Sequence, residues 1–307
     1  MTVPRTMRVR AYAKVNLTLR VGTVQPDGYH PLQTVFQSLA LHDTLEVTAR
    51  RGPFSLTCSD PGLPVDDRNL VTRAARALWS SLGRDGDPRG VAVHLTKHIP
   101  AQAGLGGGSS DAAAALSALA RLWQGRGARA DLPSVAAGLG SDVPYFLLGG
   151  TALGLARGAE LYPLEDLRAF SVVLALPPFG VPTPDAYRWF DEDGPAAGDG
   201  ARAAGGVIPA WPGRRLALIN DLEAPVVRRR PEVGAAKRAL EGAGAEAAAM
   251  TGSGSAVFGL FAGAAAARRA ARAVAEAGFV AMLTRTVDRR TCQRVHFSFA
   301  SSSPRHA

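Results

Sequence analysis

The sequence has few cysteines and no long apolar segment. Only Cys58 and Cys292 occur among 307 residues, which leaves neither a disulfide framework nor a cysteine pattern for a metal site. No stretch of 18 apolar residues is present, and the basic residues after Met1 lead into no apolar signal-peptide core. We therefore expect a cytoplasmic protein that does not span a membrane, with both thiols free and buried in strands.

The chain also lacks the marks of a nucleic-acid interface. Its 35 basic and 26 acidic residues give a formal charge of +9, but no run of five like charges occurs. Aromatic residues make up only 7% of the chain, and they are not interleaved with basic residues as an exposed nucleic-acid-binding sheet requires. The charge therefore favours small phosphorylated ligands over nucleic acid. The densest basic cluster, Arg228 to Arg230, is interpreted as the end of a solvated helix.

Two common phosphate motifs are excluded by their spacing. A P-loop requires Lys and then Ser or Thr after its last glycine, but Gly108 is followed by Ser109 and Ser110. A dinucleotide fingerprint that begins at Gly104 requires Gly or Ala at position 109, which is Ser.

The segment from Pro100 to Asp111 carries a glycine-rich loop of another kind. Its sequence, PAQAGLGGGSSD, lies between a predicted strand at 90–96 and a predicted helix at 111–124. Glycines let the backbone turn sharply and approach a ligand closely, and Ser109, Ser110 and Asp111 are good N-cap residues. The unpaired N–H groups and the dipole at a helix start attract phosphate. We predict a phosphate-binding loop; an ordinary strand-to-helix turn is the alternative.

The rest of the chain alternates between strand and helix patterns. Strands are predicted at 8–14, 16–21, 32–41, 45–49, 54–58, 90–96, 150–155, 171–176, 256–261 and 279–287, and helices at 69–82, 111–124, 132–139, 185–190, 232–240 and 264–277. This mixture predicts an α+β protein of two lobes, residues 1–160 and 161–307. Residues 191–213 are poor in large apolar side chains and are predicted to be a flexible insertion.

Asp142 and Lys14 are the candidates for chemistry. Asp142 lies in an apolar segment, where an unpaired carboxylate carries a desolvation cost, although an N-cap is the alternative interpretation. Lys14 lies in an apolar strand and needs a carboxylate or a ligand, so pairing the two would satisfy both. Two weaker candidates are His30, which could read a base edge or simply be exposed, and the glycine turn at 251–255. That turn is either a second wall around phosphates or a plain hairpin.

Taken together and in order, these segments resemble the GHMP kinase superfamily over most of the chain. The glycine loop is typical of the whole superfamily. The Lys-x-Asn and Asp-Gly-Tyr-His segments are typical of one branch, whose acceptor carries a cytidine diphosphate group. The matching segments are Ala13–Leu17, Asp27–Thr34, Asn69 and Leu70, Lys97, Pro100–Ser110, Gly140–Pro144, Pro182–Pro184, Asn220–Leu222 and Thr251–Gly254.

The resemblance implies a two-lobed GHMP kinase fold, with an N-terminal lobe like the second domain of ribosomal protein S5 and a ferredoxin-like C-terminal lobe. It implies phosphoryl transfer from ATP, as its Mg²⁺ complex, to a hydroxyl of a small alcohol in isoprenoid precursor biosynthesis. No side chain is assigned as a metal ligand. Asp142 is implied as general base and Lys14 as its partner. The residues implied at the nucleotide are Asn69, Lys97, Pro100, Ala101, Gln102, Ala103, Gly104, Leu105, Gly106, Gly107, Gly108, Ser109 and Ser110, and those implied at the substrate are Asn16, Tyr29, His30, Thr183 and Tyr187.

Two alternatives stay open beside this interpretation. A GHMP kinase for homoserine or mevalonate would lack the Asp-Gly-Tyr-His segment, and a ligand-sensing protein on the same fold would not need Asp142 and Lys14. Position 111 is Asp, where some members of the branch carry Asn, and both residues can cap a helix. We expect a monomer or a weak homodimer.

Overall fold

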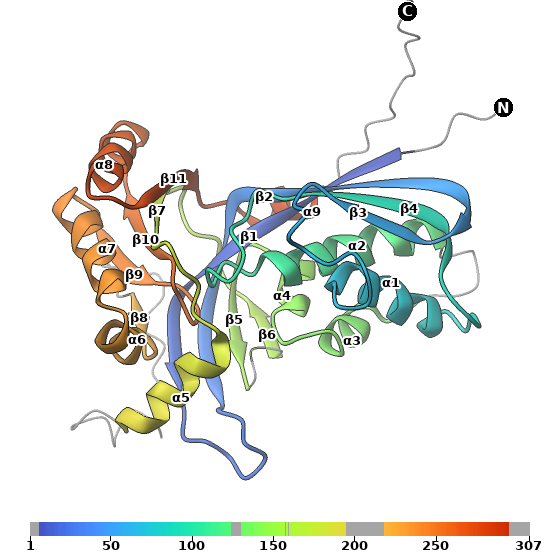
Figure 1. Ribbon diagram of the computed structural model, residues 1–307, viewed down its shortest axis with the longest axis horizontal. Helices are drawn as coiled ribbons and strands as arrows, with labels where there is room; N and C mark the ends of the chain where they lie inside the picture. The colour runs from blue at the N-terminus through green and yellow to red at the C-terminus, as the bar shows by residue number, and fades with distance from the viewer. Residues whose placement is uncertain (1–5, 124–129, 157, 159, 195–217, 295–307) are drawn as a thin grey trace, which may run out of the picture.

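The computed structural model describes residues 6–123, 130–156, 158, 160–194 and 218–294. Within these residues the chain forms two lobes, each built on its own sheet, and α5 (Thr183–Asp193) lies where the lobes meet (Figure 1).

The N-terminal lobe is built on a sheet of seven strands among the described residues. Its path runs β3-β4-β2-β1-β8, and β5 joins β2 and β6 to the side. The two long strands β1 (Thr6–Val21) and β2 (Leu32–Pro53) pair antiparallel along almost their whole length. The shorter strands are β3 (Ser55–Cys58), β4 (Arg89–Thr96), β5 (Thr151–Leu155), β6 (Glu160–Pro163) and β8 (Ile219–Asn220).

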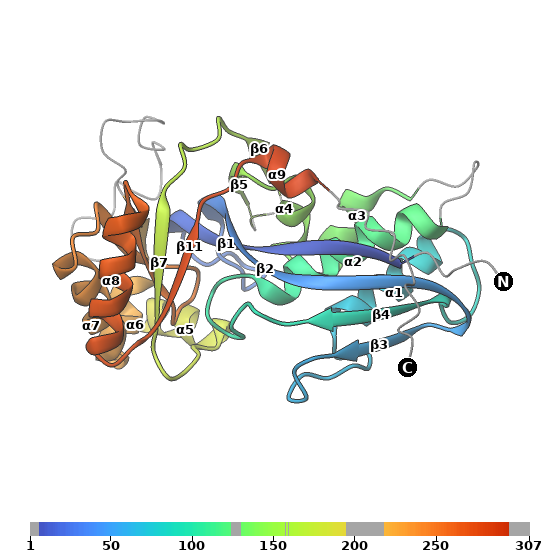
Figure 2. The ribbon, with the colours of Figure 1, turned by 90° about the horizontal axis from the view of Figure 1, so that it is seen from above.

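Four helices cover one face of this sheet, as Figures 1 and 2 show together. They are α1 (Leu70–Ser81), α2 (Gly107–Trp123), α3 (Leu132–Ala137) and α4 (Val143–Leu148). Alternate strand residues such as Leu45 and Val47 point into the shared core. Because α2 is rich in alanine, it packs closely against the sheet and buries most of its residues.

The C-terminal lobe is built on a four-stranded antiparallel sheet in the order β11-β7-β10-β9. Its strands are β7 (Ser171–Leu176), β9 (Ala247–Met250), β10 (Val257–Phe261) and β11 (Val280–Arg285), and its remaining helices are α6 (Glu223–Arg229), α7 (Pro231–Gly242), α8 (Ala264–Glu276) and α9 (Arg289–Gln293). Helices α7 and α8 pack on the outer face, and α9 returns to α4 in the other lobe (Figure 2).

The core shows why β7 is apolar at every position but one. Val173 and Ala175 pack with the helices of the C-terminal lobe, whereas Val172 and Leu174 pack with residues of β1 and β2. A strand whose alternate residues face two cores has no solvent face, so its sequence shows a continuous apolar run. The same sheet therefore joins the two lobes through an apolar interface.

The predicted α+β fold class is confirmed, and most predicted elements are present within a few residues of their predicted ends. The breaks predicted at residues 15 and 42–44 are wrong, because β1 and β2 continue through them, β1 with register shifts near Lys14 and Asn16. The helix predicted to begin at 185 begins at Thr183, since Pro184 is tolerated in a first turn. Elements that the pattern did not predict are α4, α6, α9, β6, β8 and β9.

Several smaller predictions have mixed outcomes. Cys58 lies in β3 as expected, but Cys292 lies in the helix α9, and both thiols are free and half-buried. The cluster at Arg228 does mark a helix end, that of α6, although it pairs with acidic residues of α5. Of the predicted insertion, 191–193 belong to α5, and from 195 onwards it lies outside the described residues. The lobe boundary at 160/161 stays a prediction. No helix in the described ranges is both long and apolar enough to cross a membrane.

Candidate active site

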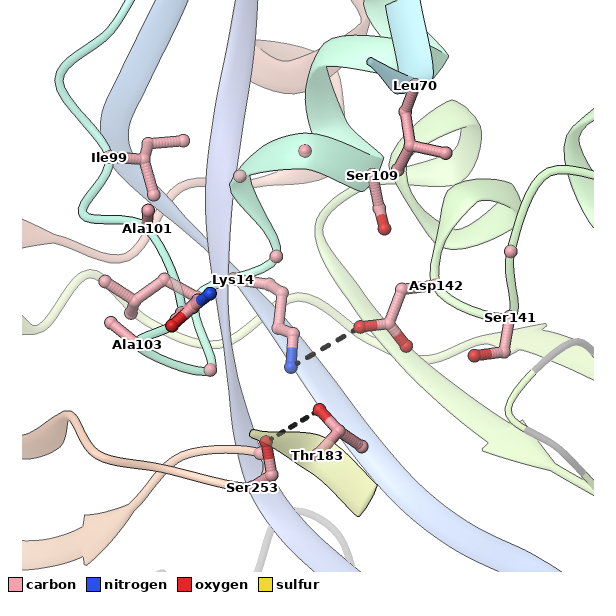
Figure 3. Close-up of a pocket in the computed structure, with 18 of the residues that line it drawn as sticks. Lys14, Leu70, Ile99, Ala101, Ala103, Ser109, Ser141, Asp142, Thr183 and Ser253 are labelled. Atoms are coloured by element: carbon pink, nitrogen blue, oxygen red, sulfur yellow. Dashed lines mark hydrogen bonds and ion pairs between the residues drawn. The ribbon is translucent and has the colours of Figure 1, made fainter. Parts of the chain in front are cut away.

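A cavity of about 840 Å³ opens between the lobes and gathers residues from both. The N-terminal lobe contributes β1, the start of α1, the loop at 99–109 and the segment 140–142. The C-terminal lobe contributes the start of α5 and the turn at 252–253 (Figure 3). Its size is within the usual range for a small-molecule site.

The glycine-rich loop lies in the cavity wall, as the sequence predicted. Gly104 and Gly106 have positive φ angles of 76° and 73°, which glycine adopts without strain. A Cβ on Gly104 would also overlap the carbonyl oxygen of Thr251. The loop therefore needs glycine for both its conformation and its close packing.

The helix after this loop begins at Gly107, four residues earlier than predicted. The N–H of Ser110 already bonds the carbonyl of Gly106, so the first unpaired N–H groups belong to residues 107–109, all of which line the cavity. The prediction that Ser109, Ser110 or Asp111 caps the helix is wrong, because all three lie within α2. The Ser110 hydroxyl donates to the carbonyl of Tyr12, and Asp111 is buried in an ion pair. The helix start still offers the unpaired donors and the dipole that suit a phosphate.

Lys14 and Asp142 meet across the cavity, as the sequence predicted. The Nζ of Lys14 lies 3.6 Å from Oδ2 of Asp142, and Figure 3 shows the two side chains pointing toward each other. The lysine side chain is 4% exposed, whereas that of Asp142 is 33% exposed. The carboxylate therefore faces the cavity while the ammonium lies behind it.

Asp142 occupies the N-cap position of α4, but its side chain makes no capping hydrogen bond. The N-cap alternative is therefore right about the position and wrong about the use of the side chain. An acceptor oxygen that faces a cavity and is not used by the backbone is available to a ligand.

Burial lowers the pKa of Lys14, and the nearby Asp142 carboxylate opposes that shift. The ammonium also donates to Oδ1 of Asn16 at 2.7 Å and lies 5.7 Å from the centre of the Phe36 ring. These contacts hold a buried charge in one place.

Lys97 lines the same cavity but is held by two buried carboxylates. Its Nζ pairs with Asp111 at 2.7 Å and with Asp43, which also accepts from the backbone N–H of Ile99. Burial lowers the pKa of Lys97, but the two carboxylates raise it by more. The structure thus places Lys97 at the predicted nucleotide site with its charge already paired. The sequence analysis did not name Asp43 as a partner of Lys97. Asp43 lies two residues before Leu45 in β2, so the alternation of the strand places both side chains on the inward face.

Asn69 also lies at the cavity wall with its side chain engaged. Its Oδ1 accepts from the N–H of Val71 at the start of α1, and its Nδ2 donates to the carbonyl of Pro64. It is the N-cap of α1, so its position is fixed by the helix rather than free to follow a ligand.

The predicted substrate residues divide into two groups. Asn16, Thr183 and Tyr187 line the cavity, but Tyr29 and His30 do not. Tyr29 is 56% exposed. His30 is buried, contrary to the alternative that it is exposed.

The His30 ring does not line the cavity, but it contacts Tyr187, which does. Its Nδ1 donates to the carbonyl of Gly22 at 2.8 Å, since a carbonyl can only accept, and its Nε2 lies 3.3 Å from Asp191 on α5. The ring centre is 5.4 Å from that of Tyr187, which does line the cavity. Burial and the nearby Asp142 raise the pKa of Tyr187, which keeps its hydroxyl neutral.

The second glycine turn closes the hairpin of β9 and β10, as one of the two alternatives expected, and it also packs against the first loop. A Cβ on Gly252 would lie 3.1 Å from the carbonyl oxygen of Gly104 and 3.3 Å from Nζ of Lys14. Asn220 holds this turn by donating to the carbonyls of Met250 and Gly252. The hydroxyls of Ser253 and Thr183 are 3.0 Å apart at the opposite wall (Figure 3). Ser253 was not predicted as a site residue.

Comparison with known proteins shows the family. The model of the GHMP kinases N terminal domain matches residues 69–150, and that of the GHMP kinases C terminal matches residues 209–280. A protein of Anaeromyxobacter dehalogenans (strain 2CP-C), named 4-diphosphocytidyl-2-C-methyl-D-erythritol kinase, is 46% identical and covers 91% of this chain and 90% of its own. The chain belongs to the GHMP kinases. It is an ATP-dependent kinase, a phosphotransferase with an alcohol group as acceptor.

Further relatives agree with this GHMP kinase assignment. A protein of the same name from Deinococcus radiodurans is 42% identical and covers 87% of this chain and 88% of its own. A crystal structure titled 4-(cytidine 5'-diphospho)-2C-methyl-D-erythritol kinase matches with a TM-score of 0.73 and 38% identity, over 91% of this chain and 99% of that chain. A homoserine kinase from Cytophaga hutchinsonii matches with a TM-score of 0.69 over 94% and 96% of the two chains, but its 19% identity shows the fold alone.

Proposed function

We propose that this GHMP kinase transfers the γ-phosphoryl group of ATP to the 2-hydroxyl of 4-diphosphocytidyl-2-C-methyl-D-erythritol, a step of the non-mevalonate route to isoprenoids. The names of relatives that cover about 90% of the chain support the acceptor. The observation that carries the chemistry is the Lys14–Asp142 pair, which faces the cavity beside the glycine loop.

In the proposed reaction Asp142 acts as general base. It accepts the proton of the acceptor hydroxyl while that oxygen forms a bond to the γ-phosphorus. The bond between the γ-phosphorus and its bridging oxygen breaks, and ADP leaves with the electron pair. Lys14 supplies a positive charge, which holds the Asp142 carboxylate in place and polarises the acceptor hydroxyl.

The nucleotide is proposed to lie along the glycine loop from Pro100 to Ser110. The unpaired N–H groups at the start of α2 suit its phosphates, and Asn69 and Lys97 border the same part of the cavity. No cluster of three or more metal-ligating side chains occurs in the described ranges, and we expect Mg²⁺ to enter bound to ATP.

The cytidine end of the acceptor is proposed to lie toward Tyr29 and His30, on the side of the cavity that Tyr187 lines. The ring contact between His30 and Tyr187 supports this direction. Thr183 and Asn16 also line the cavity, and Asn16 accepts a hydrogen bond from Lys14, so both are proposed to hold the methylerythritol unit.

A coupled ADP assay tests the acceptor. The purified protein with Mg²⁺ and ATP is given diphosphocytidyl-methylerythritol, homoserine or mevalonate, and the product is examined by phosphorus NMR. We expect turnover with the first acceptor alone and a new phosphomonoester at its 2-oxygen. Turnover with homoserine or mevalonate but not with the cytidine compound would refute the proposal.

A further inference from the structure

The segment of β1 that carries Lys14 is held from outside its own sheet. The backbone N–H of Lys14 donates to the carbonyl of Leu105 in the glycine loop at 3.0 Å. Two residues later, the N–H of Asn16 donates to the hydroxyl of Thr251 at 3.0 Å, across 235 positions of sequence. Register shifts against β2 flank this segment on both sides. The lysine therefore depends on partners from the glycine loop and from the C-terminal lobe.

The orientation of the Asn16 amide follows from the donors around it. Thr34 donates its hydroxyl proton to the carbonyl of Thr18 at 2.7 Å, because a carbonyl can only accept. Thr34 must then accept from Asn16, whose Nδ2 lies 2.8 Å away. This places Oδ1 of Asn16 on the opposite side, where it accepts from Lys14 at 2.7 Å and lies 3.3 Å from the Thr251 hydroxyl. One hydroxyl of the C-terminal lobe thus touches Asn16 at two atoms.

Thr251 itself has no access to the cavity. Its side chain is fully buried and does not line the pocket, whereas its neighbours Gly252 and Ser253 do. Its carbonyl packs on Gly104 so closely that a Cβ there would overlap it. Thr251 therefore contacts the support of the lysine and the glycine loop without contacting a ligand.

We propose that Thr251 is a positioning residue that sets the Lys14 ammonium through Asn16 and so couples the C-terminal lobe to the catalytic pair. The inference rests on the proposed roles of Lys14 and Asp142 in phosphoryl transfer. Without the hydroxyl, the buried N–H of Asn16 loses its acceptor and the amide loses one of the contacts that fix it. The ammonium of Lys14 then loses a well-oriented acceptor and is less stable in its buried place.

The test compares Thr251→Val, which removes the hydroxyl and keeps the shape, with Thr251→Ser, which keeps the hydroxyl. Thr286→Val is the matched control, because Thr286 is another buried threonine whose hydroxyl accepts a backbone N–H, that of Phe170 at 2.9 Å. We expect the valine variant at 251 to lose about tenfold to a hundredfold in kcat, with KM for ATP within about twofold. The serine and Thr286 variants should stay near wild type.

The pH profile separates positioning from a loss of stability. Because the Asn16 amide that accepts from the charged form of Lys14 is less firmly oriented in Thr251→Val, the alkaline limb of kcat should move to lower pH, and serine should restore it. The proposal would be overturned if Thr251→Val kept a kcat within threefold of wild type and the alkaline limb of its pH profile stayed in place. An equal loss in Thr286→Val would also overturn it.

A second readout does not need turnover. Competitive acetylation of the unliganded protein, followed residue by residue by mass spectrometry across pH, reports the pKa of Lys14. Thr251→Val should lower that pKa and Thr251→Ser should restore it, and an unchanged value in both would refute the inference. If the wild type phosphorylates none of the offered acceptors, the proposed function fails while this measurement still decides the role of Thr251.

Discussion

The cavity wall contains two lysines whose side chains are little exposed, 4% for Lys14 and 11% for Lys97, and that are held in opposite ways. Lys14 has one carboxylate partner, 3.6 Å away, and that partner is one-third exposed to the cavity. Lys97 has two carboxylate partners, Asp43 and Asp111, and both are almost wholly buried. The pKa of Lys14 is lowered by burial, whereas the pKa of Lys97 is raised because its two carboxylates outweigh burial.

The difference indicates two uses of the same side chain. The Lys97 group, called the closed pair below, has its charge matched by two buried carboxylates and lies beside the start of α2 at Gly107, although the buried Oδ1 of Asp111 has no hydrogen-bond partner within the described residues. The Lys14–Asp142 pair, called the open pair below, is longer and is exposed on the carboxylate side, which leaves lone pairs of Asp142 for a ligand. Burial of a lysine alone therefore does not identify a catalytic group. A catalytic group is better indicated by a carboxylate partner that is exposed to the cavity and has lone pairs not used by other groups of the protein.

The largest effect is expected when the open pair loses Asp142, the proposed base. Asp142→Asn keeps the shape and removes the charge, so kcat should fall by about 10² to 10⁴-fold, the usual size of a general-base contribution. Nucleotide binding should persist, because the glycine loop and the start of α2 are untouched. Steady-state kinetics and ATP binding by calorimetry measure the two effects.

The fold should tolerate this change, because the Asp142 side chain makes no capping hydrogen bond and faces the cavity. Thermal unfolding is the control. A variant that folds normally and keeps near-normal kcat would show that Asp142 is not the base, and a loss of only a few-fold would indicate that it merely orients the acceptor.

The second prediction compares how much each lysine contributes to the free energy of unfolding. Lys97→Met leaves two buried carboxylates without their counter-ion, which should cost about 3–5 kcal/mol of the free energy of unfolding. Lys14→Met leaves a single carboxylate that is partly solvated and removes a desolvated ammonium, so it should change stability far less. Urea unfolding of both variants at pH 8 measures the contrast.

Equal losses in the two methionine variants would remove the distinction between the open and the closed pair. A larger loss in Lys14→Met would reverse it. Activity is a separate readout, since Lys14→Met should lose most of its kcat even where its stability is close to that of wild type.

Sequence patterns predicted the open pair but not the closed one. Lys14 in an apolar strand and Asp142 in an apolar loop each needed a partner, and desolvation alone suggested that they meet. Part of the closed pair could have been predicted, because the alternation of strand residues places Asp43 on the inward face together with Leu45. Its partner Asp111 was taken for a helix cap, since the loop glycines hid a helix that already begins at Gly107.

What the sequence could not show depends on contacts between distant segments. The packing of Gly252 on Gly104 and the bond from Asn16 to Thr251 join residues of different lobes, and no local pattern carries that information. The short elements were missed for a related reason. A two-residue strand such as β8 exists because β1 lies beside it, not because of its own propensity.

The smallest expected effect concerns the titration of the closed pair. Burial, with Asp43 nearby, raises the pKa of Asp111 to about 7 even though Lys97 opposes the shift. An unfolded aspartate titrates near 4, so between about pH 4 and 7 the folded protein holds a proton that the unfolded chain has released. The stability contributed by that proton is lost as the pH rises through this window.

Asp111→Asn cannot titrate, so its stability relative to wild type should rise from pH 5 to pH 8, by about 1 to 3 kcal/mol. Urea unfolding at the two pH values measures the difference. Asp66→Asn is the control, because the exposed Asp66 has its pKa lowered by its hydrogen bonds with Arg68 and should show no such rise. A flat difference for Asp111→Asn would mean that Lys97 keeps Asp111 ionised throughout, and the closed pair would then be a permanent ion triad that does not respond to pH.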